Sequence, residues 1–426
     1  MFGTLKYTKL ADDQAFARLA DCLAVGVAVS LPWSTSATSI LIVLWLAAVL
    51  PTLSTDRVKR ELMTAAGGLP VLLWTLAAVG MLWADVTWSE RLVGLRPFHR
   101  LLVIPLLLAQ FRRSEDGVWV FYGYLASALS VLVASGALAL LPGLCWWCLS
   151  VGVPAKDYIF QSESFAICAL VLIGCACEQG RVGKWRQALG LTALAASFLA
   201  DIFFVTSGRT VLLVLPVLAV FIGWRQFGAK GLLGASLAGV VVSTSVWYTS
   251  PYLRARLTHS VAEFRAYQSS DAPNSTGMHL AFLRESLTIV ATAPMIGHGT
   301  GSIPEQFRLV TSGRNSSSSV ATVNPHNQIF AIAIQLGLIG TGVLMAMWIA
   351  HLLLFPGSSF AALVGAVIVI ENVVASLFNS HLFDFTQGWL YVFGVGVAGG
   401  IVLRERDRGM NASHSATAVP CGAKTQ

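Results

Sequence analysis

The chain has 426 residues, of which 55% are hydrophobic and 12% are charged, and its mean hydropathy is +0.70. Soluble globular proteins carry about a quarter charged residues, so this composition excludes a soluble protein with one large core and predicts a polytopic membrane protein. The net charge of +7 fits the usual bias of lysine and arginine toward cytoplasmic loops, and it gives no reason to expect nucleic acid as a partner.

Apolar stretches long enough to cross a membrane recur along the chain as far as about residue 403. A membrane-spanning helix needs roughly 17–25 mostly apolar residues. We therefore expect an all-α fold with about twelve spans; the fourth is short and contains Pro105, so it is tilted, broken or partly interfacial. The expected spans are 17–32, 34–52, 66–84, 98–111, 117–141, 160–178, 188–206, 210–224, 231–249, 326–350, 359–378 and 386–403.

The connectors between these spans alternate in charge. One set contains "DRVKRE", "FRRSED", "RVGKWR" and "WRQFGAK". The tail 404–426, which begins with "RERDR", belongs to the same set. The alternate connectors are poorer in lysine. Because basic residues favour cytoplasmic loops and the expected number of spans is even, both termini are expected in the cytoplasm. Spans one to nine then occupy 1–249, and spans ten to twelve occupy 326–403.

Arg209 interrupts two apolar runs in "FFVTSGRTVLLVLP", at the outer end of the seventh and eighth spans. An arginine inside a membrane costs several kcal/mol unless its side chain reaches the surface or lines a polar cavity. One interpretation is that Arg209 snorkels to the outer headgroups. The other is that it points into an outer cavity covered by the next long loop.

That loop, 250–325, is the longest connector, and it lies on the outer side in the expected topology. Its basic residues are all arginines, whose planar fork binds phosphate oxygens bidentately, whereas lysine offers a single point charge. The alternative is that they pair with acidic residues of the loop or with lipid headgroups. The arginines are Arg254, Arg256, Arg265, Arg284, Arg308 and Arg314.

Within the loop, "LAFLRESLTIVATAPMIGHGTGS" predicts an amphipathic helix that runs from Leu280 through Ile289. Arg284 and Glu285 are expected together on its polar side. Pro294 and the glycines that follow are expected to end the helix. A helix in this position, lying at the outer interface, would hold Arg284 at headgroup depth.

The end of the loop, "NPHNQ", places His326 between Asn324 and Asn327 at the start of an apolar helix. A neutral imidazole, with a pKa near 6.5, can take a proton from an attacking hydroxyl group. The two asparagines would orient the ring or bind a sugar. The alternative is a structural role in which an asparagine caps the helix. The other histidines that could act as the base are His259, His279 and His298.

Outer arginines and one histidine suit an anionic lipid-linked substrate such as a polyprenyl diphosphate. We expect no metal cofactor, because the outer carboxylates form no Asp-x-Asp pair or other tight cluster, and the arginines would then neutralise a leaving diphosphate. Ordinary packing or an optional disulfide is expected for Cys145 and Cys148 of "CWWC". The scattered outer carboxylates are Asp85, Glu90, Asp157 and Asp384.

The order of "SGRT", "FLRESLTIVATAPMIGHGTGS" and "NPHNQIFAIAIQLGLIG" resembles the O-antigen ligase and polymerase superfamily, most strongly over about 200–345. "PMIGHG" is similar to the family's Pro-x-x-Gly-x-Gly, which is preceded by an arginine at the spacing of Arg284. "HNQ" before a long apolar helix is similar to its His-Asn signature. Each motif is weak alone, but their order and spacing together are fairly specific.

The resemblance implies a membrane-embedded, GT-C-like glycosyltransferase of the bacterial inner membrane that transfers glycans from undecaprenyl diphosphate at the periplasmic face. For such a reaction we expect His326 to be the base of an inverting transfer, and Arg209, Arg284 and, more weakly, Arg265 to bind the diphosphate. Asn324 and Asn327 would have a supporting role in substrate binding. Membrane lipids would surround the protein.

Three branches of the superfamily fit this pattern. Ligases transfer O-antigen to the lipid A–core oligosaccharide, polymerases join repeat units on the carrier, and protein O-oligosaccharyltransferases modify serine or threonine. One long outer connector and a short tail favour a ligase. A transporter also has about twelve spans, but it would have inverted repeats and a site at mid-depth, whereas the charges here gather at the outer face.

Overall fold

The computed structural model describes residues 2–141, 143, 151–206, 208–270, 274–312 and 321–417. Side chains are described from Gln14 to Asn411 within these ranges, apart from that of Ser270. Over these ranges the chain is helical and has no strand, as the composition predicts. Cys145 and Cys148 lie outside the described residues.

The helices follow one another with short connections. They are α1 (Phe2–Ser30), α2 (Thr35–Val49), η1 (Leu50–Thr52), α3 (Thr55–Leu62), α4 (Ala65–Gly80), α5 (Trp88–Leu95), η2 (Arg96–Leu102), α6 (Val103–Phe111), α7 (Gly117–Leu140), α8 (Tyr158–Arg181), α9 (Trp185–Phe204), α10 (Val211–Thr249), α11 (Pro251–Ser270), α12 (Ser275–Thr292), α13 (Ile303–Thr311), α14 (Gln328–Leu354), α15 (Phe360–Ala375) and α16 (Phe385–Thr417).

Eight helical runs in the described part of the chain are long and apolar enough to cross a membrane, and the bent pair α3 and α4 makes a ninth. The expected count of twelve is therefore not confirmed. The three further expected spans correspond to α1, to α15 with its 16 residues, and to one half of α10. The fourth expected span, 98–111, was drawn too short: the continuous run begins at Trp88, where Thr87 and Glu90 form a capping box.

Glycines with positive φ break two of the long helices. α10 is interrupted at Gly228, with φ of 61°, and folds back on itself, since a Cβ at Gly231 would lie 1.8 Å from the carbonyl oxygen of Gly223. Its two halves correspond to the expected eighth and ninth spans. α14 is interrupted at Gly337, with φ of 62°. Such backbone conformations favour glycine, which has no Cβ to clash.

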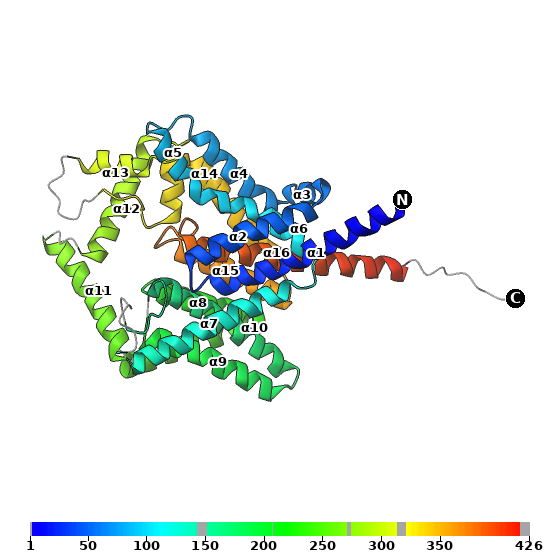
Figure 1. Ribbon diagram of the computed structural model, residues 1–426. Helices are drawn as coiled ribbons and strands as arrows, with labels where there is room; N and C mark the ends of the chain where they lie inside the picture. The colour runs from blue at the N-terminus through cyan, green and yellow to red at the C-terminus, as the bar shows by residue number, and fades with distance from the viewer. Residues whose placement is uncertain are drawn as a thin grey trace.

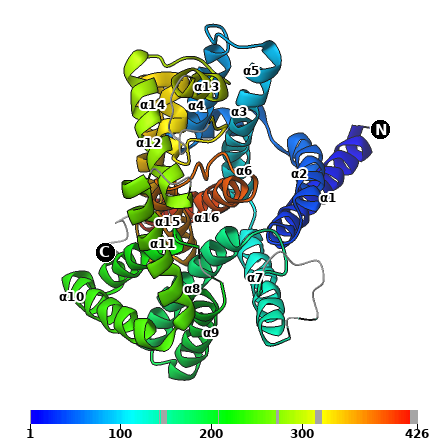
Figure 2. The ribbon, with the colours of Figure 1, turned by 90° about the vertical axis from the view of Figure 1, so that its left-hand side faces the viewer.

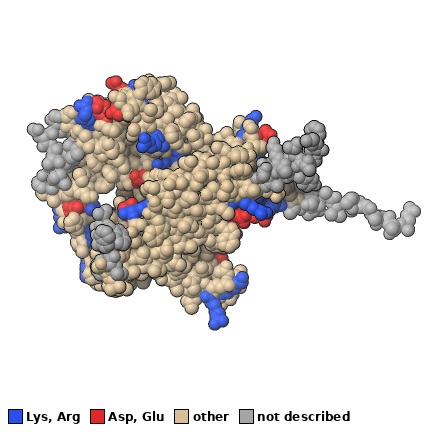
Figure 3. Space-filling model, in the orientation of Figure 1, with Lys and Arg blue, Asp and Glu red and all other residues tan. Residues whose placement is uncertain are grey.

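The two termini lie on one side of the molecule, and α11, α12 and α13 lie on the opposite side (Figure 1). α11 and α12 connect the group formed by α8, α9 and α10 with the group formed by α4, α5 and α14 (Figure 2). Charged side chains gather toward these two sides in Figure 3, with a broad uncharged band between them. This arrangement is typical of a protein that spans a membrane, whose hydrocarbon core excludes charge.

The innermost helices are α8 and α16, whose apolar runs are 78% and 89% buried, compared with 28% for α7, α9 and α10. In the described part of the chain, many apolar side chains of α9 and α10 are exposed, such as Leu189 and Val240, and they suit contact with lipid. α16 and α15 are joined by the segment 376–384, which lies against the start of α14 because the amide of Gln328 donates to the carbonyl of Ser376 at 2.8 Å. This segment forms one wall of the candidate site.

Candidate functional site

His326 lies where the long loop enters α14, in a left-handed backbone conformation with φ of 51°. Its backbone amide donates to Oδ1 of Asn324 at 2.9 Å, which fixes the turn. Asn327 caps α14, since its Oδ1 accepts from the amides of Ile329 and Phe330 at 2.9 and 3.1 Å. The structural alternative therefore applies to Asn327, whereas Asn324 orients the backbone of His326.

Asn324 also ties the turn to segment 376–384. Its Nδ2 donates to Oδ1 of Asn379 at 3.1 Å, and its Oδ1 accepts from the hydroxyl of Ser380 at 2.7 Å. Arg100 of η2 supports the same segment from the protein interior by donating to the carbonyl of Phe383 at 3.2 Å. The wall opposite His326 is thus held by side chains from two other parts of the fold.

Asn379 connects His326 to Asp384. Its Nδ2 donates to Oδ2 of Asp384 at 2.8 Å, and its Oδ1 is 3.0 Å from Nδ1 of His326. A carboxylate only accepts hydrogen bonds, so it fixes the orientation of the Asn379 amide and turns its oxygen toward the imidazole. His326 must therefore carry a proton on Nδ1 to make this bond, which leaves the lone pair of Nε2 available in the neutral ring.

Asp384 in turn contacts His381, whose side chain is 1% exposed. Nδ1 of His381 is 3.2 Å from Oδ2 of Asp384, and its Nε2 is 3.1 Å from Oε1 of Glu163 on α8. Burial opposes the charge on this imidazole, but the two carboxylates outweigh it and raise the pKa of His381 to about 10. A protonated His381 forms ion pairs with both carboxylates and links α8 to the wall of the site.

The other side of His326 faces α12. Its ring stacks on Phe282 at a centroid distance of 5.7 Å and an angle of 15°, and meets the edge of His279 at 4.7 Å. These contacts fix the plane of the imidazole and partly exclude water from it. They also bring the loop helix α12 over the start of α14.

Burial shapes the electrostatics of both histidines. Burial lowers the pKa of His326 below its ordinary value of 6.5, and Asn379 and Asp384 offset this only in part. Burial also lowers the pKa of His279, with His326 and Arg209 acting in the same direction, to about 4. Both rings are therefore neutral at neutral pH. For His326, this is the state in which Nε2 can accept a proton.

The side chain of Arg209 contacts two helices of the long loop, α11 and α12. Its Nη1 is 3.1 Å from Oε2 of Glu263 on α11, and it donates to the hydroxyl of Thr276 on α12 at 2.9 Å. That hydroxyl donates to the same carboxylate at 2.6 Å. The guanidinium is 39% exposed. Thr276 lies three residues before His279 on the same side of α12, so Arg209 is about one helical turn from the His326 cluster.

The structure does not bring the other two expected arginines into this cluster. Arg284 lies on the exposed side of α12, and Arg265 on the exposed side of α11; neither side chain has a hydrogen bond or ion pair within the described ranges. The expectation that Glu285 shares the polar side of α12 with Arg284 was wrong, because Glu285 is 2% exposed. Residues one position apart are about 100° apart around a helix, so one can face inward while the other faces outward.

The glycine-rich stretch after α12 occupies the break in α14. The amides of His298 and Gly299 donate to the carbonyls of Ile334 and Gln335 at 2.8 and 2.9 Å, which the break at Gly337 leaves without partners in the helix. A buried helix break needs such replacements for its lost hydrogen bonds. The stretch thus anchors α12 to the interior. His298, a competing base in the sequence, uses its ring to contact the end of α12.

Sequence reasoning missed three members of this site. Asn379 and His381 gave no signal of their own, because the partners that join them to the rest of the site, His326 and Glu163 respectively, are more than 50 residues away in the sequence. Glu163 did carry a signal: an ionisable residue inside an apolar span marks a functional or paired position. Asp384 was counted among scattered carboxylates, yet it is joined to the site through Asn379.

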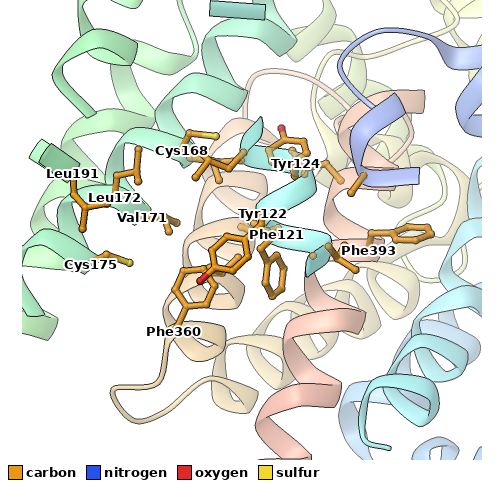
Figure 4. Close-up of a pocket in the computed structure, with 18 of the residues that line it drawn as sticks. Phe121, Tyr122, Tyr124, Cys168, Val171, Leu172, Cys175, Leu191, Phe360 and Phe393 are labelled. Atoms are coloured by element: carbon orange, nitrogen blue, oxygen red, sulfur yellow. The ribbon is translucent and has the colours of Figure 1, made fainter. Parts of the chain in front are cut away.

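No group of three or more histidine, cysteine, aspartate or glutamate side chains in the described part of the chain is arranged to hold a metal ion. Two apolar cavities lie elsewhere among the helices. One, of about 370 Å³, is lined by α7, α8, α15 and α16, and aromatic side chains such as Phe121, Tyr122 and Phe360 surround it (Figure 4). The other, of about 900 Å³, lies among α8, α9, α10 and the start of α11.

Comparison with known proteins agrees with this architecture. Residues 194–345 match the family model described as O-antigen ligase. The matched range contains Arg209, the loop helices α11 to α13, His326 and the first half of α14, whereas Asn379 and Asp384 lie beyond it. No curated protein matches the chain. Within this multi-pass helical fold, residues 194–345 are therefore similar to the O-antigen ligase family.

Proposed function

We propose that the protein is an O-antigen ligase. It transfers O-antigen polysaccharide from undecaprenyl diphosphate to the lipid A–core oligosaccharide, in an inverting reaction that needs no metal ion. The observation that carries this proposal is the geometry of His326: Asn379, oriented by Asp384, holds Nδ1–H at 3.0 Å and leaves Nε2 free to act as a base.

The reaction follows from these roles. An acceptor hydroxyl attacks the anomeric carbon from the face opposite the diphosphate, forming the new carbon–oxygen bond. Its proton passes to Nε2 of His326, and the bond from the anomeric carbon to the diphosphate breaks, with the electron pair leaving on the diphosphate. Asp384 stabilises the resulting imidazolium through Asn379. General-base catalysis of this kind is worth about a hundred- to ten-thousand-fold in rate.

Arginines take the negative charge of the leaving group. Arg209 is the best placed, since it lies beside His279 and one of its nitrogens already binds an oxygen anion, that of Glu263. A guanidinium has five N–H donors, so Arg209 can keep Glu263 and still donate to a phosphate. Arg284 is exposed on α12 and available to the donor headgroup. Arg265, on the exposed side of α11, has the weakest support.

We place the protein in the bacterial inner membrane, with the His326 site at the periplasmic face and both termini in the cytoplasm. What supports this orientation is that the termini lie opposite α11, α12 and α13 (Figure 1), and that the lysine-rich connectors fall on the side of the termini. At the periplasmic membrane surface, a lipid-held donor and a lipid-held acceptor can meet.

The test is the lipopolysaccharide of a strain that lacks this chain. We expect loss of the long-chain ladder while carrier-linked polymer remains, with restoration by the wild-type chain but not by His326→Ala. Core capped with a single repeat unit would instead mean that the protein is a polymerase. A normal ladder together with loss of glycan from a protein would mean an O-oligosaccharyltransferase.

A further inference from the structure

The larger of the two apolar cavities ends beside the long loop. It has a volume of about 900 Å³ and is lined by α8, α9, both halves of α10, and Leu253 and Leu257 of α11. Along the second half of α10 the lining runs from Lys230 to Trp247, which at 1.5 Å per residue is about 25 Å. This is close to the roughly 30 Å thickness of a membrane's hydrocarbon core. The cavity is long and apolar enough for an extended hydrocarbon chain.

Arg256 lies on α11 between Leu253 and Leu257, the two residues that line the loop end of this cavity. Its guanidinium lies over the ring of Tyr158 at the start of α8, 4.9 Å from the centroid. The side chain is half-buried, and its Nε is buried with no hydrogen-bond partner among the described residues. A buried guanidinium nitrogen without an acceptor is unfavourable, so this cation is well prepared to take an anionic ligand.

The position of Arg256 on α11 separates it from the other arginines of the loop. Arg265 is nine residues later, which at about 100° per residue puts it on the opposite, exposed face. Glu263 is seven residues later and shares the face of Arg256, about 10 Å further along the helix. Since Glu263 binds Arg209, the inner face of α11 directs two guanidinium groups toward the same side of the loop.

We propose that this cavity and Arg256 form one binding site for a lipid phosphate: the cavity takes a long isoprenoid chain, and Arg256 binds the phosphate or diphosphate at its end. A cation at the mouth of an apolar cavity is complementary to an amphiphilic anion, and neither a free phosphate nor a neutral lipid would use both parts. The inference rests on the proposed function, because it assigns the chain and headgroup of the proposed donor to particular residues.

Binding of the lipid itself, without transfer, tests the site. The full-length protein in nanodiscs is titrated with three probes: undecaprenyl diphosphate, undecaprenol, which lacks the phosphates, and geranyl diphosphate, which has a short chain. We expect Arg256→Gln to weaken binding of undecaprenyl diphosphate by about ten- to a hundred-fold, the loss of one or two charge-assisted hydrogen bonds. Binding of undecaprenol should be unchanged.

Arg308→Gln is the control, since it removes the same charge from an exposed arginine of the loop that pairs with Glu305 on α13, and it should change the affinity less than about threefold. Arg256→Lys should recover part of the affinity, because it keeps the charge without the fork. If Arg256→Gln binds undecaprenyl diphosphate as tightly as Arg308→Gln does, or weakens the binding of undecaprenol equally, Arg256 is a structural residue and the proposal is overturned.

A cavity-filling variant tests the chain independently. A Cβ at Gly239, which lines the cavity, would have no atom within 4 Å, so Gly239→Leu fills space without a clash. This variant should weaken the binding of undecaprenyl diphosphate and leave the binding of geranyl diphosphate unchanged. Gly342→Leu, equally unobstructed but outside the cavity, is its control. Unchanged binding in Gly239→Leu overturns the chain's placement. If the wild-type protein binds no undecaprenyl diphosphate, the proposed donor fails together with this site.

Discussion

The side chain of Asn379 stands between His326 and Asp384, accepting from the imidazole at 3.0 Å and donating to the carboxylate at 2.8 Å. The amide therefore transmits the orientation set by Asp384 to the ring that is proposed to act as the base. An asparagine in this place fixes the tautomer of His326 without putting a full negative charge against it. The distance between the ring and the carboxylate also keeps burial as the main influence on the pKa of His326.

Removing that amide should slow turnover without removing the donor. We expect Asn379→Ala to lower kcat by about a hundredfold, within the range typical of general-base catalysis, while KM for the lipid-linked donor changes little. Steady-state kinetics on purified substrates measure both. Asn327→Ser is the control, because serine caps a helix as asparagine does and should keep activity within a few-fold. Equal losses in the two variants would mean that Asn379 acts only by holding the loop.

The arginines should differ in importance. Arg209→Ala and Arg284→Ala should each lower transfer by at least about a hundredfold while the protein still inserts, since loss of one donor to a developing anion has effects of this size. Lysine should restore little, because it lacks the bidentate fork. Arg265→Ala should have the smallest effect of the three. Full activity in Arg284→Lys would show that Arg284 supplies only surface charge.

The two histidines predict a loss of function and of stability in acid. His326 must be neutral to accept a proton, so the rate should rise with pH through its lowered pKa and be level at neutral pH. The folded-state pKa of His279 is about 4, below its ordinary 6.5, so the unfolded chain binds more protons between these values. Stability is therefore complete above about pH 6.5 and falls as the pH drops toward 4.

Thermal unfolding measured as a function of pH checks this. Between pH 7 and pH 4 the melting temperature of His279→Gln should fall less than that of the wild-type protein, because glutamine does not titrate. His259→Gln, on the exposed side of α11, is the control and should follow the wild-type curve. If both variants follow the wild type, His279 does not limit stability in acid.

The reaction should proceed without divalent metal. In the proposed reaction the arginines replace a cation at the leaving diphosphate, and the described carboxylates form no group that could hold one. Purified protein in excess chelator should keep its transfer activity. Complete loss of activity that Mg²⁺ or Mn²⁺ restores would contradict the proposal, because the negative charge would then need a metal ion.

Much of the fold could be predicted because membrane helices depend on local composition. The apolar runs, the break at Pro294 and the glycines around it all follow from single segments of sequence. A single segment does not show which distant part of the chain supplies the hydrogen bonds that a helix break removes. The glycine-rich stretch looked like a helix end, but its amides fill the gap that Gly337 opens in α14, forty residues away.

The site was predicted less completely for the same reason. His326 and Arg209 stood out as polar residues at apolar boundaries, and the structure brings both against α12, where His326 contacts His279 and Arg209 contacts Thr276. Periodicity shows which face of a helix is polar on average, but not which polar residue is buried, as Glu285 illustrates. The support from Asn379 depends on pairing between distant segments, which a single sequence does not reveal.

The most direct test of the proposal is turnover by His326→Gln on a purified lipid-linked donor and the lipid A–core acceptor. Glutamine can accept a hydrogen bond but is not an effective base. The variant should lose transfer by about a hundred- to ten-thousand-fold while donor binding survives, and the wild-type product should have the inverted anomeric configuration. Near-native turnover by His326→Gln would contradict the assignment of His326 as the base, and a product with retained configuration would contradict the single-displacement reaction.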